Sequence, residues 1–600
     1  MKVSDFIIRR LEEHGVRDVF LLSGGGMMHL LDSLAQSEKI HPWYTLHEQA
    51  AAVCAEAASQ VNGQLGVCMV TSGPGATNAI TGAVNAWIDS DPVLVISGQA
   101  KTSDLVGDRG VRQTGSQEVN ITAMMRCASN YAVTIQDKKM VKYHLDKAIY
   151  LATHGRKGTV WVDVPLDIQG AQVEEDTLTA FDPAAEGLVP TSTVSEGDLD
   201  DVLQLLRTAK RPLVLAGKGV LLDQAAPLLR EFCRRLQIPA LATCPAKMVF
   251  ADEDPLYFGQ PGSPAPRYSN WIVQSCDLLL TVGSRLNTAV TVFDETRFAS
   301  QAKQIIVDID KNEIAKLRIP FAKALVCGAR DFLARLNARV EDMAPLDTAK
   351  WLEYCRAAKA AYPIWKERQP NPQSQVNAYL FGHLLSNFIC PEDVHVYSST
   401  GRASVISAIC YERKEGQAVV DLEGLGSMGF ALPAAIGACI ASGKRRTVVI
   451  DGDGSMQHNL QELALIRGYG LPIKLFVLNN GGYSSISVMQ DHHFHGRHAG
   501  CDAASGVFLC DMKKAAGLYG LRYDVIRGDE EIEPVLRRVM ADDEPVLCEF
   551  FVDRTFDEIP KAVSRVNPDG TMTSSSLEDL FPFLPKEETQ RWMRAAEDAK

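Results

Sequence analysis

Short apolar runs alternate with stretches of helical periodicity along most of the chain. The clearest runs cover residues 19–22, 66–70, 93–96, 160–164, 212–216, 278–282 and 304–308. Largely apolar runs of this length are typical of parallel strands that are buried on both faces. The alternation begins again at about residue 375. The pattern therefore predicts an α/β protein with three doubly wound parallel-sheet domains.

Breaks in this alternation predict where the domains end. Residues 174–197 are polar, contain prolines and show little periodicity, as a linker does. Residues 344–373 form a second, largely helical connector. We therefore expect domains at 1–175, 190–340 and 375–555. The tail, 556–600, has few strand signals and is expected to pack over the outside.

Composition narrows the possible functions and the compartment. The net charge of −13 argues against non-specific binding to nucleic acid or to an anionic membrane. The first residues, MKVSDFIIRRLEEHGV, predict an amphipathic helix rather than a signal peptide, and no apolar run has membrane-spanning length. Fourteen cysteines without a C-x-x-C pair suggest buried thiols in a reducing cytoplasm.

The stretch TVVIDGDGSMQHNLQELALIRGYGLPIKLFVLNNGGY, residues 447–483, predicts a strand, a turn, a helix and a second strand. Such a crossover makes the strands parallel, so Asp453 and Asn480 meet at one sheet edge. Their oxygens suit Mg²⁺, and Gly454 and Ser455 open a helix whose free N–H groups attract an anion. The alternative is an ordinary strand-to-helix turn with Ser455 as N-cap.

G-D-G-S followed by N-N at this separation resembles the diphosphate motif of thiamine diphosphate enzymes. The resemblance implies that Mg²⁺ is held by Asp453, Asn480 and the carbonyl of Gly482. The domain order resembles that of the acetolactate synthase branch of this family: pyrimidine-binding, central and diphosphate-binding. The other expected cofactor contacts in this motif are Gly452, Gly454, Ser455 and Tyr483.

The segment WYTLHEQAAAVCAEAASQ places Glu48 in the first turn of an Ala-rich helix. The helix N-terminus favours the charged carboxylate and burial favours the neutral acid, so the sequence leaves its pKa open. Glu48 matches the family's buried Glu, which activates the cofactor from the pyrimidine side. TSGPGATN resembles the turn beside that ring, with Pro74 and Asn78 as contacts. In this family the Glu and the metal site come from different chains, which implies a homodimer or a dimer of dimers.

Two further segments resemble cofactor-binding turns. In DLEGLGSMGFALPAAIGA, residues 421–438, the G-S-M-G run implies that Gly426 contacts the cofactor and that Met428 is the apolar wedge that bends it. A methionine beside glycines is otherwise a gap filler in a core. The S-T-G-R turn adds Gly401 and Arg402 as expected contacts to the pyrimidine and the diphosphate.

Two polar segments are expected near the reaction centre. RGVRQTGSQEVN, residues 109–120, resembles the segment that faces it, where Gln113 and Gln117 are neutral donors for a carboxylate or an oxyanion; a solvated loop is the equal alternative. MQDHHFHGRH contains four histidines, but their spacing matches no standard metal site. The matching family segment is a mobile loop that closes over the cofactor, so we expect a lid.

Three positions depart from the acetolactate synthase pattern: Leu166 replaces a Lys, Ala289 an Arg and Met489 a Trp. The Arg and the Trp are associated with selecting a second 2-ketoacid, whose carboxylate an apolar side chain cannot bind. The motifs LAGKGV and VDIDKNEI are compatible with FAD in the central domain, but glycines after a strand suit any doubly wound unit, and we do not claim FAD.

These observations predict a carboligase that depends on Mg²⁺ and thiamine diphosphate. It would decarboxylate a 2-ketoacid donor, with pyruvate expected, and transfer the two-carbon unit to a carbonyl acceptor, an aldehyde or a ketone such as a keto-sugar. The opening GVRDVFLLSGGGMMHL resembles acetolactate-synthase-like proteins of surface-sugar pathways. Acetolactate synthase proper, a substrate-specific decarboxylase and a catalytically silent cofactor-binding scaffold are the alternatives.

Overall fold

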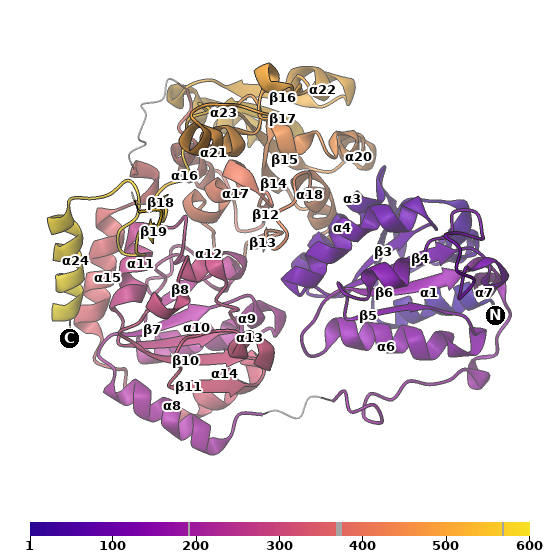
Figure 1. Cartoon of the computed structure of the whole chain (residues 1–600), viewed down its shortest axis with the longest axis horizontal. Coiled ribbons are helices and arrows are strands. Elements are labelled where there is room, and N and C mark those ends of the chain that lie inside the picture. Colours follow the sequence, from indigo (N-terminus) through magenta and orange to yellow (C-terminus); the bar gives the residue numbers. More distant parts are fainter. Residues whose placement is uncertain (190–192, 368–374, 567–568, 600) are drawn as a thin grey trace.

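The computed structural model describes residues 1–189, 193–367, 375–566 and 569–599. It contains three parallel sheets of six, five and six strands, each in its own α/β unit (Figure 1). The predicted α/β class with three doubly wound sheets is confirmed. Residue 190, the predicted start of the second domain, lies outside the described residues, as do residues 368–373 of the predicted connector and residue 600.

The first sheet has the strand order β2-β1-β3-β4-β6-β5. Its strands are β1 (Asp18–Leu21), β2 (His41–Tyr44), β3 (Gly66–Val70), β4 (Val93–Gln99), β5 (Tyr131–Thr134) and β6 (Val160–Pro165). The main helices are α1 (Val3–Glu13), α2 (Met28–Ala35), α3 (Glu48–Asn62), α4 (Pro74–Asp89) and α6 (Val141–Thr153). Every residue of β3, β4 and β6 is buried, which explains why their sequences are mostly apolar.

The second sheet has the order β11-β10-β9-β7-β8. Its strands are β7 (Pro212–Ala216), β8 (Ala240–Ala242), β9 (Leu278–Val282), β10 (Lys303–Asp308) and β11 (Lys323–Val326). The main helices are α8 (Glu196–Thr208), α10 (Ala226–Leu236), α11 (Arg267–Ser275) and α14 (Ala329–Arg339). The apolar runs predicted at 212–216 and 278–282 coincide with β7 and β9.

The third sheet, β13-β12-β14-β15-β17-β16, repeats the strand order of the first. Its strands are β12 (Val394–Val396), β13 (Ala418–Val420), β14 (Thr447–Gly452), β15 (Ile473–Asn479), β16 (Arg522–Ile526) and β17 (Val546–Phe551). Its helices include α16 (Ala378–Ser386), α17 (Gly401–Val405), α18 (Ala431–Ala441), α20 (Leu463–Tyr469), α21 (Ser484–Phe494), α22 (Met512–Leu518) and α23 (Ile532–Val539). β14 and β15 are parallel neighbours, as predicted.

The first and third units meet through helices α3 and α18. One continuous apolar core contains residues of both helices and of both sheets. Small side chains allow the close approach: a Cβ at Gly437 would lie 2.3 Å from the carbonyl oxygen of Cys54. The separation of the two helices is therefore set by main chain against main chain.

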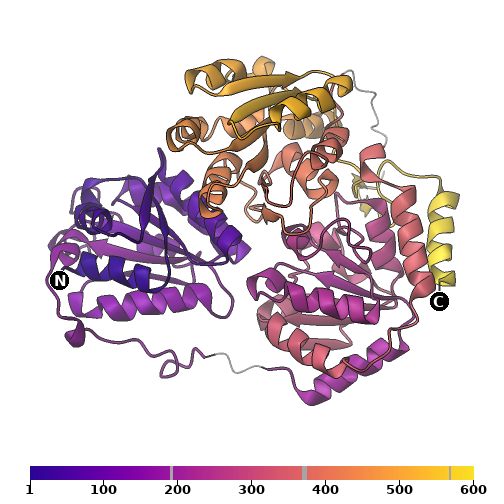
Figure 2. The ribbon, with the colours of Figure 1, turned by 180° about the vertical axis from the view of Figure 1, so that it is seen from behind.

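The segments outside the three sheets run along the surface. After β6, residues 171–189 run along the first unit with little regular structure (Figures 1 and 2). The tail forms a short hairpin, β18 (Ser564–Val566) and β19 (Met572–Ser574), and helix α24 (Lys586–Asp598). This helix packs on α11 and α15 (Ala349–Ala361), where the rings of Trp592 and Trp271 stack at 5.7 Å. In the part of the chain that the structure describes, no helix is both long and apolar enough to cross a membrane.

Candidate functional site

The carboxyl ends of β14 and β15 bring Asp453 and the N-N-G-G turn together. One carboxylate oxygen of Asp453, Oδ2, accepts hydrogen bonds from the N–H groups of Gly481 at 3.0 Å and Gly482 at 3.2 Å. Burial raises the pKa of Asp453 to about 7, against the opposing effect of these main-chain donors. A carboxylate held this far from water is stabilised in its charged form by a cation.

Asn480 supplies the second feature that fits a cation. Its amide nitrogen donates to Ser484 Oγ at 2.6 Å, which fixes the orientation of the side chain. Its carbonyl oxygen, Oδ1, is buried and has no hydrogen-bond partner among the described residues. A buried oxygen without a donor is costly unless a ligand fills the place. The donor set of carboxylate and amide oxygens fits Mg²⁺.

Glycines and small side chains shape the turn for a ligand. A Cβ at Gly454 would lie 2.5 Å from the Tyr483 ring, and one at Gly482, whose φ is +143°, would lie 2.2 Å from the carbonyl of Cys501. Around Gly452 no atom lies within 4 Å of the corresponding position. Ser455 is not the N-cap: its Oγ accepts from the Gly429 N–H at 2.8 Å and so joins the two motif loops. The alternative prediction that Ser455 is the N-cap is therefore wrong.

Glu48 opens helix α3, and its side chain is 8% exposed. Its Oε2 accepts a hydrogen bond from the Asn78 amide at 3.0 Å. Asn78 belongs to α4, which begins at Pro74 after the strained residue Gly73, whose φ is +60°. The predicted pair of Glu48 and Asn78 is thus in contact, with Pro74 at the start of the same helix.

The Glu48 end of α3 faces the third unit of the same chain. The amide of Asn459 donates to Gln49 Oε1 at 3.0 Å and to the carbonyl of Gly429 at 2.7 Å. Glu462 accepts from the Leu46 N–H at 3.1 Å. Within the chain described, the Glu48 end of α3 therefore contacts the segment that follows the Asp453 turn. The expectation that Glu48 and the metal motif come from different chains of a dimer stays a prediction.

The remaining predicted contacts lie around the same space. Gly426, whose φ is +69°, and Met428 belong to the loop between β13 and α18, which Ser399 anchors by donating to the carbonyl of Ser427. Gly401 begins α17, and Arg402 beside it is 4% exposed. Arg402 donates to the carbonyl of Arg554 at 3.1 Å, whereas its Nε has no partner among the described residues. A buried guanidinium with a free N–H fits an anionic ligand.

The loop of residues 109–120 is organised by Glu118. Its carboxylate accepts from the N–H groups of Val106, Thr114 and Gly115. Gln113 is exposed and uses its amide on the carbonyl of Glu118 at 3.0 Å. Gln117 is also exposed, and its carbonyl would lie 2.7 Å from a Cβ at Gly73. Gln117 therefore stands beside the Pro74 turn, while the role of both glutamines stays a prediction.

The predicted lid differs from expectation in its first part. Residues 484–494 form helix α21 instead of a loop, and the helix ends at His495 in a left-handed conformation with φ +54°. Met489, one of the three departures, lies on this helix and is 42% exposed.

A buried cluster of ionisable side chains behind the Met428 loop was not predicted. Five carboxylates meet where the three units join, and we call them the acidic junction: Glu56, Asp89, Asp91, Asp421 and Glu423. Lys218, from the loop after β7, donates to Asp91 at 2.9 Å. The signal was present in the sequence, since D-L-E-G-L-G-S-M-G puts two acids directly before the motif glycines.

The acidic junction borders a cavity of about 490 Å³ between the three units. Lys218 and Gly219 of LAGKGV line it, and a Cβ at the neighbouring Gly217 would lie 2.2 Å from the carbonyl oxygen of Gly283. Close packing of two loops thus accounts for the glycine. Lys218 of the same motif is committed to Asp91. These motif residues are explained without a nucleotide, and no FAD is proposed.

Comparison with known proteins gives consistent matches along the chain. Residues 1–124 match the N-terminal TPP binding domain of thiamine pyrophosphate enzymes, residues 199–336 their central domain, and residues 399–550 their C-terminal TPP binding domain. The chain is 31% identical over 582 residues to the acetolactate synthase isozyme 2 large subunit of Escherichia coli K12, covering 97% of this chain and 100% of that one. It is 30% identical over 585 residues to a probable acetolactate synthase large subunit of Methanocaldococcus jannaschii, covering 96% and 95%.

Proposed function

Since the chain belongs to the acetolactate-synthase-like branch of the thiamine pyrophosphate enzymes, we propose that it decarboxylates a 2-ketoacid and transfers the two-carbon unit to an aldehyde or a ketone. Pyruvate is the proposed donor. The observation that carries this proposal is the position of Glu48, whose helix opens against Asn459 and the Met428 loop. A proton-transfer acid and a diphosphate motif then serve one reaction centre.

We propose Mg²⁺ and thiamine diphosphate as cofactors. Asp453, the free Oδ1 of Asn480 and the carbonyl of Gly482 would hold the metal, and Arg402 would contact the diphosphate. When bound, the cofactor supplies the electron sink that decarboxylation of a 2-ketoacid needs. Glu48 would hold a proton at its carboxyl group against the pyrimidine ring, and Asn78 would keep that group in place.

The proposed acceptor follows from three polar or aromatic residues of acetolactate synthases that this chain lacks. Leu166, Ala289 and Met489 stand where acetolactate synthases have Lys, Arg and Trp, and none of the three can pair with a carboxylate. A neutral carbonyl acceptor, such as a keto-sugar, fits these side chains better than a second 2-ketoacid. The second candidate is acetolactate formation, which the names of the relatives favour.

The deciding experiment measures CO₂ release from pyruvate by the purified protein with Mg²⁺ and thiamine diphosphate, with and without a panel of acceptors. Product masses identify the acceptor. Release that rises with one aldehyde or ketone, and gives a two-carbon adduct of it, supports the proposal. Acetolactate as the sole product would establish the second candidate. Cofactor binding without release would remove pyruvate as the donor.

We further propose a cytoplasmic homodimer. Residues 171–189, which have little regular structure, would let two copies exchange their first units while keeping the contacts of α3 with α18. Co-expressed Glu48→Gln and Asp453→Asn chains test this. If each site combines Glu48 of one chain with Asp453 of the other, co-expression should restore about a quarter of wild-type turnover. Half of the dimers contain one chain of each kind, and one of the two sites in each such dimer carries neither change. Sites built within one chain would restore none.

A further inference from the structure

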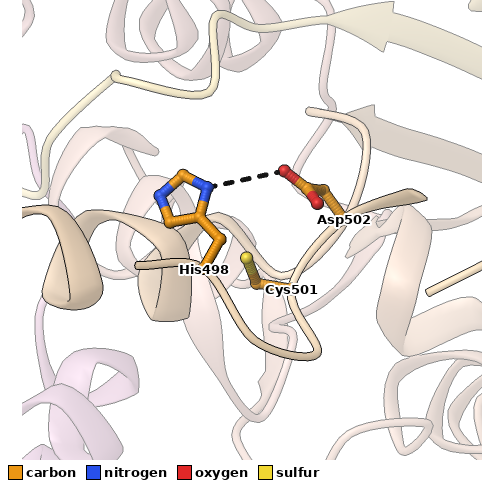
Figure 3. A group of neighbouring side chains, drawn as sticks. All are labelled: His498, Cys501 and Asp502. Carbon is orange, nitrogen blue, oxygen red and sulfur yellow. Dashed lines mark ion pairs between the residues drawn. The ribbon is translucent and has the colours of Figure 1, made fainter. Parts of the chain in front are cut away.

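We propose that His498, Cys501 and Asp502 form a zinc site that fastens the segment after α21 to the cofactor motif. The three side chains come from one turn, and Figure 3 shows them directed toward a common space. One ligand atom of each lies within 4.8 Å of the other two. Nitrogen, sulfur and carboxylate oxygen are together the donor set that zinc takes in proteins.

The spacing of two of these atoms fits a bridging metal better than a hydrogen bond. Nδ1 of His498 lies 3.7 Å from Oδ2 of Asp502. This separation is too long for a good hydrogen bond. Two ligands of a tetrahedral zinc ion, each about 2.1 Å from the metal, are roughly 3.4 Å apart. A shift of a few tenths of an ångström would complete that edge.

A second carboxylate fixes the other side of the imidazole. Nε2 of His498 lies 2.7 Å from Oδ1 of Asp491, at the distance of a strong hydrogen bond. Donation from Nε2 leaves the lone pair of Nδ1 facing Cys501 and Asp502. Histidines that bind metals are commonly oriented in this way, by a carboxylate on the nitrogen that does not touch the metal.

Cys501 is 1% exposed, while the side chains of His498 and Asp502 are 19% and 20% exposed. The sulfur therefore lies at the inner end of the group, and an ion enters from the solvent side. Two residues compete with an ion: the Arg554 guanidinium lies 3.2 Å from the same oxygen of Asp502, and the Ser505 hydroxyl lies 3.5 Å from the Cys501 sulfur. Arg554 is 47% exposed, so it can move into solvent when an ion binds. Three protein ligands leave a fourth position for water.

The location couples this group to the metal motif of the proposed cofactor site. The Tyr483 N–H donates to the carbonyl of Cys501 at 2.7 Å, and Gly482 pairs with Asp502 through an antiparallel bridge. Asp491 lies on α21. Zinc would thus link the end of α21 and the 498–502 turn to the carbonyl of Gly482, and it would hold this wall of the cofactor site in place. The inference rests on the geometry of these residues and does not require the proposed reaction.

Zinc content and affinity test the proposal on the full-length protein. Chelator-treated protein is saturated with Mg²⁺ and thiamine diphosphate, titrated with zinc against a chromophoric chelator, and then dialysed and analysed for metal. We expect about one zinc per chain. His498→Ala and Cys501→Ser should abolish tight binding, and Asp491→Asn should weaken it about 10–100-fold. Cys510→Ser and His492→Ala, changes at exposed residues of the same region, are the matched controls.

Co²⁺ binding gives an absorption signal that depends on a bond between the metal and the Cys501 sulfur, so a purely structural role of Cys501 would not produce it. Co²⁺ in this site should show a thiolate-to-metal absorption band that is lost in Cys501→Ser and kept in Cys510→Ser. Thermal unfolding without zinc verifies that each variant folds. If Cys501→Ser does not fold, His498→Ala, which changes a residue on the solvent side, replaces it in the test. Wild-type protein without tight zinc binding, or variants that bind as wild type does, would overturn the proposal.

Discussion

Replacing Lys218 with Met should destabilise the protein by an amount that depends on pH. The Lys218 ammonium lies 2.9 Å from Asp91, and the two side chains are 14% and 2% exposed. Removing one partner of a buried pair costs about 3–5 kcal/mol, because the remaining charge is left uncompensated. Here the loss should reach the upper end, since four further carboxylates of the acidic junction surround the pair.

The pH dependence follows from the raised pKa values of these acids. Burial raises the pKa of Asp91 and of Asp421 to about 6 and that of Glu423 to about 8. A carboxyl group with a raised pKa holds its proton more tightly in the folded protein than in the unfolded chain. Its stabilising contribution is complete below the unfolded pKa, near 4, and is lost as the pH rises through the folded value. Without Lys218 the ionised forms lose their counter-charge, so the effect of the substitution should grow from about pH 5.5 to about pH 8.5.

Urea unfolding at these two pH values measures the effect. Lys210→Met, at an exposed lysine of the same unit, is the control and should change the midpoint little. Asp421→Asn in the Lys218→Met background should recover part of the loss, because one of the uncompensated charges is removed. An equal loss of unfolding free energy at both pH values, or a loss below about 1 kcal/mol, would refute the inference that Lys218 is the counter-charge of the acidic junction.

Three further outcomes are expected. Glu48→Gln should lower turnover about 10²–10⁴-fold while cofactor binding, followed by calorimetry, stays near wild type; unchanged turnover would remove its proposed role. Asp453→Asn should weaken Mg²⁺-dependent cofactor binding at least about tenfold, as measured by Mg²⁺ titration, and equal affinity would argue against the metal assignment. Gly437→Val should cost at least about 1–3 kcal/mol in thermal unfolding because its Cβ would meet the Cys54 carbonyl, whereas Gly468→Ala, where the space is open, should be neutral or stabilising.

The three sheets could be predicted from the sequence because their strands are buried on both faces. The runs at 66–70, 212–216 and 278–282 coincide with β3, β7 and β9. Each carries apolar residues without alternation, so no helical periodicity competes. The meeting of Asp453 and Asn480 was equally predictable, since the parallel pairing of β14 and β15 fixes where the two residues must lie.

The features that could not be predicted from the sequence depend on contacts between segments that are far apart along the chain. Lys218 and Asp91 are 127 positions apart, and nothing near either residue announces the other. The zinc-type group was not predicted, because only His498 of the four neighbouring histidines takes part in it. Its partners Asp491 and Asp502 lie on a helix and in a turn, and the helix itself was not predicted. Whether one chain or two build a site also depends on the path of a connection that has no periodic pattern.

The contact of α3 with α18 has a consequence for how this enzyme could be altered. Because Gly437 meets the main chain of Cys54, the spacing between the Glu48 end and the Met428 loop is nearly independent of side-chain choice at the surface. Random mutagenesis should therefore find few tolerated changes along these two helices. Substrate range should diversify instead through the exposed positions of segments 109–120 and 484–497 other than Asp491, which can vary while the distance between Glu48 and the Met428 loop stays the same.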